Sequence, residues 1–169
     1  ELVFLRGMTM QSAVPRDSNG RSQFGMVAAN PLRVGTFMDD AILASLVESI
    51  SKANANKLLE IVNYNVRGLQ YVLAGHVFTL EVLSEALTAL KKQGPKLLTD
   101  VNKLISIATA KVTSRRDAAV EAGRVLKLKR GQATIPLPGI DVPFHSRFLR
   151  SGVASFRALL RRIYSVEQV

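Results

Sequence analysis

The sequence contains no cysteine, which excludes disulfide bonds, thiolate metal sites and a cysteine nucleophile. It also has no apolar run of the roughly 20 residues that a membrane-spanning helix needs, and its first residues do not resemble a signal peptide. We therefore expect a soluble, cytoplasmic protein whose fold depends on packing alone. With 169 residues, 47% of them hydrophobic, the chain is long enough to bury a core as one domain or a compact subdomain.

Several chemical motifs are missing as well. The chain has no Gly-x-Ser-x-Gly turn that would present a serine nucleophile and no glycine-rich loop that would bind phosphate. Its two histidines, His76 and His145, are far apart and its carboxylates are scattered, so the sequence predicts no metal site. The sequence therefore offers no nucleophile of its own.

The net charge of +10 belongs to the second half of the chain. Residues 1–90 carry seven basic and eight acidic side chains, whereas residues 91–169 carry sixteen and five. Such a surface attracts nucleic acid, the phosphates of coenzyme A or an acidic carrier protein, and it is also compatible with a solvated charged face. Charge alone does not choose between these interpretations.

Hydrophobic periodicity predicts an alternation of strands and helices. The expected order is a strand over 24–29, a helix from 39, strands over 58–63 and 70–74, a helix from 79 that stops at Gly94-Pro95, further helices from 97, a strand over 133–137 and a helix from 151. The helix from 79 has one leucine stripe, made of Leu80, Leu83, Leu87 and Leu90. This order predicts an α+β fold of ferredoxin-like layout, with an insertion before its last strand.

Three residues are candidates for chemistry. His145 follows a proline-stiffened segment that could hold an imidazole in one orientation as a general base, although from the residues alone a structural role remains open. His76, at the end of a predicted strand, is interpreted as an ordinary loop histidine. Arg6 lies in an apolar stretch, which predicts a buried guanidinium paired with a protein carboxylate or with the carboxylate of a substrate.

Four stretches of the chain carry a resemblance to a known family. They are 2–11, 14–17 with 20–22, 60–65, and 135–146, in that order. Together they resemble the malonyl/palmitoyl transferase region of the fungal-type fatty acid synthase beta subunit, a member of the acyltransferases that load acyl carrier proteins. The segment 93–129 contributes least to this resemblance.

The resemblance implies roles for individual residues. Arg6 corresponds to the arginine that pairs with the malonyl carboxylate, and His145 to the histidine that activates the nucleophilic serine. Gln11, Asn63 and Asn65 are expected to line the cleft, although hydrogen bonding at turns and strand ends explains the two asparagines equally well. The family serine, in a Gly-His-Ser-Leu-Gly turn, would precede Glu1. We therefore expect a piece of a longer polypeptide that is inactive by itself.

The resemblance also implies how the chain is divided. Residues 1–21 would leave a hydrolase-like α/β acyltransferase subdomain, 22–137 would form a ferredoxin-like small subdomain with a helical insertion at about 95–130, and 138–169 would return to the large subdomain with the catalytic histidine. The active site would lie in the cleft between the two subdomains.

The implied reaction belongs to fatty acid biosynthesis by a multifunctional enzyme. Malonyl would move from coenzyme A to the phosphopantetheine of acyl carrier protein, and palmitoyl from the carrier to coenzyme A; these thioesters are substrates, and no cofactor is expected in this piece. The expected partners are the rest of the synthase polypeptide, its other subunit and the carrier, with no nucleic acid and no membrane.

Two other interpretations remain. A basic ferredoxin-like layout is shared with RNA-binding modules, but the predicted strands lack the aromatic Gly-Phe pattern that such modules use to stack bases. Alternatively, the chain is a structural scaffold whose basic half docks an acidic carrier or neighbouring subunits.

Overall fold

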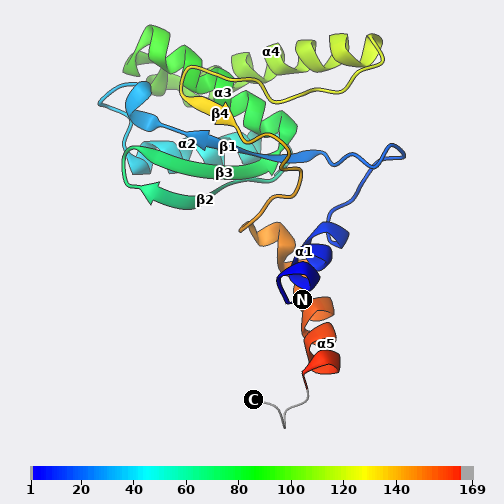
Figure 1. The fold of residues 1–169 in the computed structure, drawn as a ribbon. Coiled ribbons are helices and arrows are strands. Elements are labelled where there is room, and N and C mark those ends of the chain that lie inside the picture. The colour runs from blue at the N-terminus through cyan, green and yellow to red at the C-terminus, as the bar shows by residue number, and fades with distance from the viewer. Residues whose placement is uncertain (1, 165–169) are drawn as a thin grey trace.

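The computed structural model describes residues 2–164 as a four-stranded sheet, with α2, α3 and α4 on one side and α1 and α5 on the other (Figure 1). The elements are α1 Leu2–Ser12, β1 Phe24–Ala29, the 3-10 helix η1 Pro31–Arg33, α2 Asp40–Ala53, β2 Leu59–Val66, β3 Gln70–His76, α3 Val77–Gln93, η2 Pro95–Asp100, α4 Val101–Glu121, β4 Thr134–Pro136, η3 Arg147–Gly152 and α5 Val153–Ile163. No helix within this part of the chain is both long and apolar enough to cross a membrane.

The sheet has the strand order β2-β3-β1-β4, and every neighbouring pair is antiparallel. The central strands β1 and β3 pair along their whole common length, from Phe24 opposite His76 to Ala29 opposite Tyr71. The outer strand β4 is only three residues long, and β2 has two register shifts. Neither outer strand therefore offers a long regular edge to another chain.

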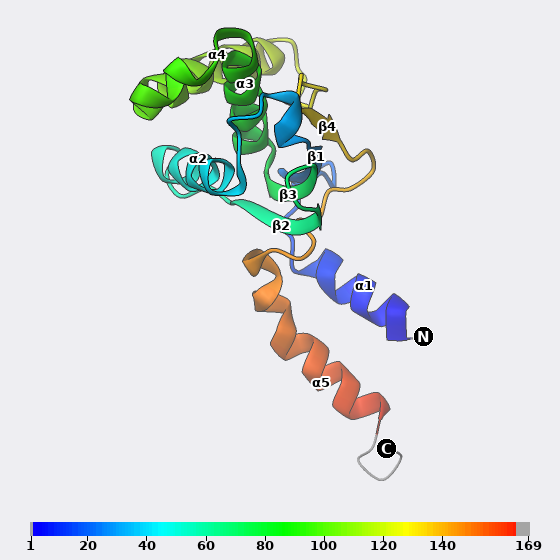
Figure 2. The same cartoon turned by 90° about the vertical axis from the view of Figure 1, so that its left-hand side faces the viewer.

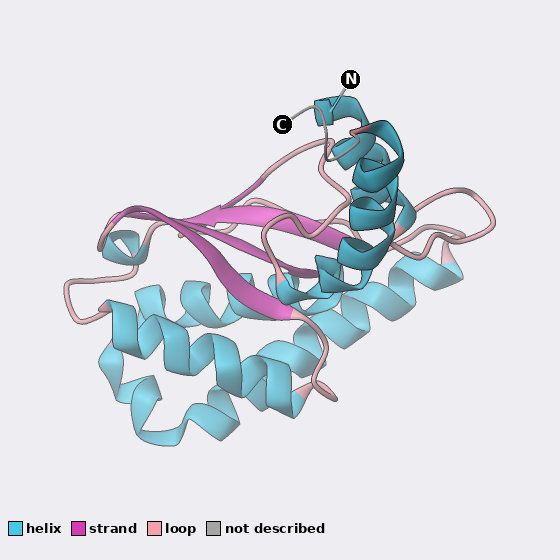
Figure 3. Ribbon diagram, turned by 90° about the horizontal axis from the view of Figure 1, so that it is seen from below, coloured by secondary structure: helices cyan, strands magenta, loops and turns pink. Residues whose placement is uncertain are grey.

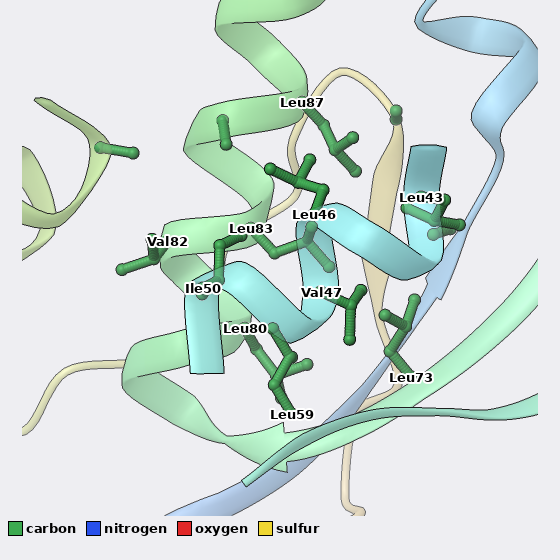
Figure 4. Close-up of a cluster of buried hydrophobic side chains, with 14 of the residues drawn as sticks. Leu43, Leu46, Val47, Ile50, Leu59, Leu73, Leu80, Val82, Leu83 and Leu87 are labelled. Carbon is green, nitrogen blue, oxygen red and sulfur yellow. The ribbon is translucent and has the colours of Figure 1, made fainter. Parts of the chain in front are cut away.

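The main core lies between the sheet and the layer formed by α2, α3 and α4 (Figure 2). The predicted leucine stripe of α3 is confirmed, since all four leucines are 0–1% exposed. In Figure 4 the side chains of Leu80, Leu83 and Leu87 point toward α2, which contributes Leu46 and Ile50. Spacings of three and four residues place these leucines on one helix face. Other residues of α3, such as Val82 and Ala86, are buried as well, because α3 also packs against α4.

The predicted order of elements is confirmed from β1 onward, with changes at several boundaries, whereas α1 was not among the predicted elements. Asp39 begins α2 as predicted, because its carboxylate accepts a hydrogen bond from the Ile42 N–H at 2.8 Å. Gly94, with φ of +78°, ends α3 where the sequence places the stop. β3, in contrast, continues to His76, and α3 begins two residues earlier than expected.

A second, smaller packing layer covers the opposite face of the sheet. Met26 and Ala74 are a buried cross-strand pair, and the alternation of side chains along a strand places them on the face away from the helical layer. On the same face, the ring of Phe24 packs against Phe148 of η3 with ring centroids 4.5 Å apart. Residues 147–152 are thereby attached to the sheet.

A buried carboxylate fastens the helical layer together. Glu81 of α3 is 2% exposed, and it accepts hydrogen bonds from the Arg115 guanidinium at 2.5 Å and from the backbone N–H of Lys129 at 2.6 Å. It therefore ties α3 to α4 and to the segment that leads into β4. Burial raises the pKa of Glu81 above its ordinary value of 4.5, and the two donors oppose that shift only in part.

The raised pKa of Glu81 predicts a particular pH dependence of stability. A carboxyl whose pKa is higher in the folded state stabilises that state most below pH 4.5, and this contribution is lost as the pH rises through the folded-state pKa. We expect the free energy of unfolding of the wild type, relative to Glu81→Gln, to fall as the pH rises from 4.5. Urea unfolding of both proteins across this range measures the difference, and a constant difference would contradict the prediction.

Candidate active site

An ion pair joins the segment after α1 to the segment after β4. The Arg16 guanidinium makes two bonds to the Asp141 carboxylate, at 2.5 and 3.1 Å, and donates to the carbonyl of Gly20 at 2.8 Å. The hydrogen bonds from Arg16 lower the pKa of Asp141 below its ordinary value. Helix α1 also contacts η3 and α5 (Figure 3). Residues that are distant in the sequence are thus brought together at one side of the sheet.

His145 projects from a tight turn in this region. Its backbone φ is +62°, an uncommon value for a residue with a side chain. The turn is held by a hydrogen bond from the Ser146 hydroxyl to the carbonyl of Pro143 at 2.6 Å, and both Val142 and Ser146 are buried. The imidazole itself is exposed and makes no hydrogen bond within residues 2–164. The structure therefore fixes the backbone of His145 and leaves its ring accessible.

Arg6 is not buried, contrary to the expectation from its apolar surroundings. Its side chain is exposed on α1, and the neighbouring Val3 and Phe4 are also exposed, by 82% and 68%. Arg6 has no ion pair within residues 2–164 and borders a pocket of about 470 Å³ that Arg161 of α5 also lines. His145 does not line this pocket, which therefore does not bring the two predicted site residues together.

The three residues expected to line a cleft lie in different settings. Gln11 is exposed, and its side-chain carbonyl accepts a hydrogen bond from Arg16. Asn63 of β2 is half-buried opposite Val72. Asn65 is exposed beside a register shift in β2, so the two asparagines do not continue one regular strand.

Asn63 shares a sheet face with η3. Its partner Val72 lies two residues before Ala74 on β3, and Ala74 pairs with Glu60, so all four side chains project to the same side. Glu60 forms an ion pair with Arg147 at 2.6 Å and accepts a hydrogen bond from its backbone N–H at 3.0 Å. Asn63 therefore lies on the face that receives the segment following His145.

His76 has a structural role that differs from the predicted loop position. It is the N-cap of α3, where its Nδ1 accepts a hydrogen bond from the Phe78 N–H at 3.1 Å, and its Nε2 faces the side-chain oxygen of Gln23 at 2.8 Å. An accepting Nδ1 places the proton on Nε2. Burial, aided by the charge of Lys57, lowers the pKa of His76 and favours this neutral form. Both ring nitrogens of His76 therefore have partners within the fold, and the residue serves as a helix cap.

The pairs Arg16–Asp141 and Glu60–Arg147 were missed by sequence reasoning. Their partners are 125 and 87 residues apart, so no local spacing indicates them. Asp141 does lie within the 135–146 stretch singled out above, and Arg147 directly follows it, which was the available signal. Within residues 2–164 there is no group of three or more side chains suited to holding a metal ion.

Comparison with known proteins identifies the family. The model of the acyl transferase domain matches residues 1–166 of the chain. The chain belongs to the acyl transferase domain family. This acyl transferase chain is 44% identical over 181 residues to the fatty acid synthase subunit beta of Aspergillus oryzae, a match that covers 99% of the chain and 8% of that relative.

Two further relatives agree with this assignment. The acyl transferase chain is 46% identical over 173 residues to fatty acid synthase 2 of Mycosarcoma maydis and 41% identical over 175 residues to the fatty acid synthase subunit beta of Saccharomyces cerevisiae. Both matches cover 100% of the chain, and they cover 4% and 8% of the relatives. The chain therefore spans less than a tenth of the length of these relatives. The resemblance to fungal fatty acid synthases is confirmed, and the RNA-binding alternative finds no support.

Proposed function

We propose that the chain is the histidine-bearing part of a malonyl/palmitoyl transferase within a fatty acid synthase. The observation that carries this proposal is the match along the whole chain to an acyl transferase domain and to fungal fatty acid synthase subunits. The partners we propose are the remainder of the synthase polypeptide, its other subunit and acyl carrier protein, in the cytoplasm.

We further propose that residues 22–137 form a ferredoxin-like small subdomain. The strand order β2-β3-β1-β4, fully antiparallel and with α2 and α3 on one face, supports this topology. Helices η2 and α4 lie within the helical insertion at about 95–130. Residues 1–21 and 138–169 would belong to the large hydrolase-like subdomain, an assignment supported by the contacts of α1 with η3 and α5.

In the proposed mechanism, a serine outside these 169 residues attacks the thioester carbon of malonyl-CoA while His145 takes the serine proton. The tetrahedral intermediate collapses to an acyl-serine, and the thiolate of coenzyme A leaves with a proton from the imidazolium. The phosphopantetheine thiol of the carrier then attacks the acyl-serine, with its proton taken by His145 and returned to the serine oxygen. Palmitoyl moves by the same steps in the opposite direction, from the carrier to coenzyme A.

The side chains of this chain divide the tasks of the reaction. The exposed imidazole of His145 on a fixed turn suits a base that must reach a serine from another segment. The exposed guanidinium of Arg6, without an ion pair in the described part of the chain, suits a substrate carboxylate. Gln11, Asn63 and Asn65 are proposed to line the cleft. Without the serine, the chain alone is expected to be inactive.

A substitution at Arg6 tests this proposal by its effect on two acyl groups. In the complete synthase we expect Arg6→Ala to lower malonyl transfer about 10- to 100-fold and to leave palmitoyl transfer nearly unchanged, because only malonyl has a free carboxylate to bind. Initial rates of transfer from each radiolabelled thioester to the carrier or to coenzyme A measure both effects.

The matched control is Arg157→Ala, which removes another exposed arginine, from α5, that does not line the Arg6 pocket. We expect the control to leave both rates unchanged. Equal losses of malonyl and palmitoyl transfer in Arg6→Ala would assign Arg6 a structural role.

A further inference from the structure

A groove lies between helices of the helical layer. These helices lie on the other side of the sheet from α1 and α5 (Figure 1). The groove has a volume of about 570 Å³ and runs between α3 and the segment formed by η2 and the first half of α4. Leu97 and the buried Leu104 and Ala108 line it, and Ile107 is 60% exposed among its lining residues. The groove therefore presents an apolar strip that is partly open to solvent.

Lysine ammonium groups surround this apolar strip. Lys92, Lys96 and Lys103 are exposed and have no ion pair within residues 2–164. The two acidic residues that line the groove are already engaged: Glu85 pairs with Lys111 at 2.5 Å and with an arginine of α4, and Asp100 accepts the hydrogen bond that caps α4. Four lysines line the groove against these two carboxylates, so net positive charge is left over around the apolar strip.

We propose that this groove binds an acidic amphipathic helix of a partner protein. The residues of α4 that line the groove extend from 103 to 111, about two and a half helical turns, so a helix of similar length can lie along it. Apolar side chains of the partner contact Leu97 and Ile107, and its carboxylates pair with Lys96 and Lys103. This is the helix-in-groove mode of recognition, with charge complementarity fixing the orientation.

The composition of the groove favours a protein over a nucleic acid. Proteins bind single strands by stacking bases on aromatic side chains, and no aromatic residue lines this groove. The partner also has access independently of acyl transfer, because Arg6 and His145 belong to segments on the other side of the sheet. The groove is a docking site whose occupation leaves those residues free, and its existence does not depend on the proposed mechanism.

Nuclear magnetic resonance on the isotope-labelled chain tests the groove directly. The probe is a synthetic helical peptide with glutamates on one face and leucines on the other, added at physiological ionic strength. We expect chemical-shift changes confined to the amides of 85–111. The double variant Lys96→Glu/Lys103→Glu is expected to weaken binding about tenfold or more, since like charges then face each other. Ile107→Ser, which removes the exposed apolar contact, is expected to weaken it also.

Two matched controls separate the groove from general basicity. Arg157→Glu/Arg162→Glu reverses the same number of charges on exposed residues of α5 and is expected to leave binding unchanged. A peptide of identical composition, scrambled so that its charged and apolar residues share no common faces, is expected to bind more weakly. The proposal is overturned if the helical peptide causes no shifts, if the shifts centre on α5, or if the scrambled peptide or a single-stranded nucleic acid binds the groove as tightly.

Discussion

Replacement of His145 by alanine in the complete synthase is expected to lower malonyl and palmitoyl transfer together, by about 10²- to 10⁴-fold, the range that a positioned general base contributes. Both transfer rates fall because the same imidazole acts in both steps. It accepts the serine proton when the acyl-serine forms, and it accepts the thiol proton of the carrier or of coenzyme A when the acyl-serine breaks down. Steady-state rates with each acyl donor, and the amount of acyl-serine formed in a single turnover, measure the two halves of the reaction.

The other histidine provides the control for this experiment. His76→Gln retains a side chain that can accept a hydrogen bond at the start of α3, and His76 has no place in the proposed chemistry. We expect this variant to keep full transfer rates. If the His145→Ala synthase is correctly assembled and still turns over at the wild-type rate, His145 is not the base. The positive φ of His145 would then be explained by the turn alone.

Most of the helices and strands after α1 could be predicted because each carries its own local signal. A stripe of leucines at helical spacing places one face of α3 in the core whatever that face packs against. Gly94 before a proline ends this helix through backbone geometry that is almost independent of context. For the same reason Asp39 caps α2 as expected. These signals extend over a few residues, so the sequence contains them fully.

The sequence indicated individual site residues, but it did not indicate their burial or their arrangement in space. Apolar neighbours indicated a buried Arg6, yet Val3 and Phe4 are largely exposed in the described chain. Whether an apolar helix face is buried depends on what packs against it, and that information is not local. His76 was interpreted as a loop residue, whereas it caps α3. Its Nδ1 accepts a hydrogen bond from the Phe78 N–H.

Tertiary ion pairs could not be predicted from the sequence for a related reason. Arg16 and Asp141 are far apart in the sequence, and many other pairs of opposite charge have similar separations. Only the fold selects the pair that meets. The same limit explains why the basic second half suggested several partners at once, whereas the structure separates the lysines around an apolar groove from the arginines of α5.

Leu83→Ala is expected to reduce the free energy of unfolding of the chain by about 2–5 kcal/mol, through lost apolar burial and the cavity left behind. Leu83 is 0% exposed at the centre of α3, where its side chain points toward α2 (Figure 4). A loss of this size is a large part of the stability of an ordinary domain, so a lower urea midpoint should be readily measured.

The control for Leu83 is Val120→Ala on α4, since Val120 is 63% exposed and its truncation is expected to change the free energy of unfolding by less than about 0.5 kcal/mol. Comparison of the two variants separates lost packing from a change in helix propensity, because both residues lie in helices and alanine favours helix at either position. A loss below about 1 kcal/mol for Leu83→Ala would mean that α2 and α3 do not pack around this side chain. The helical layer would then lack the rigidity that a docking groove between α3 and α4 requires.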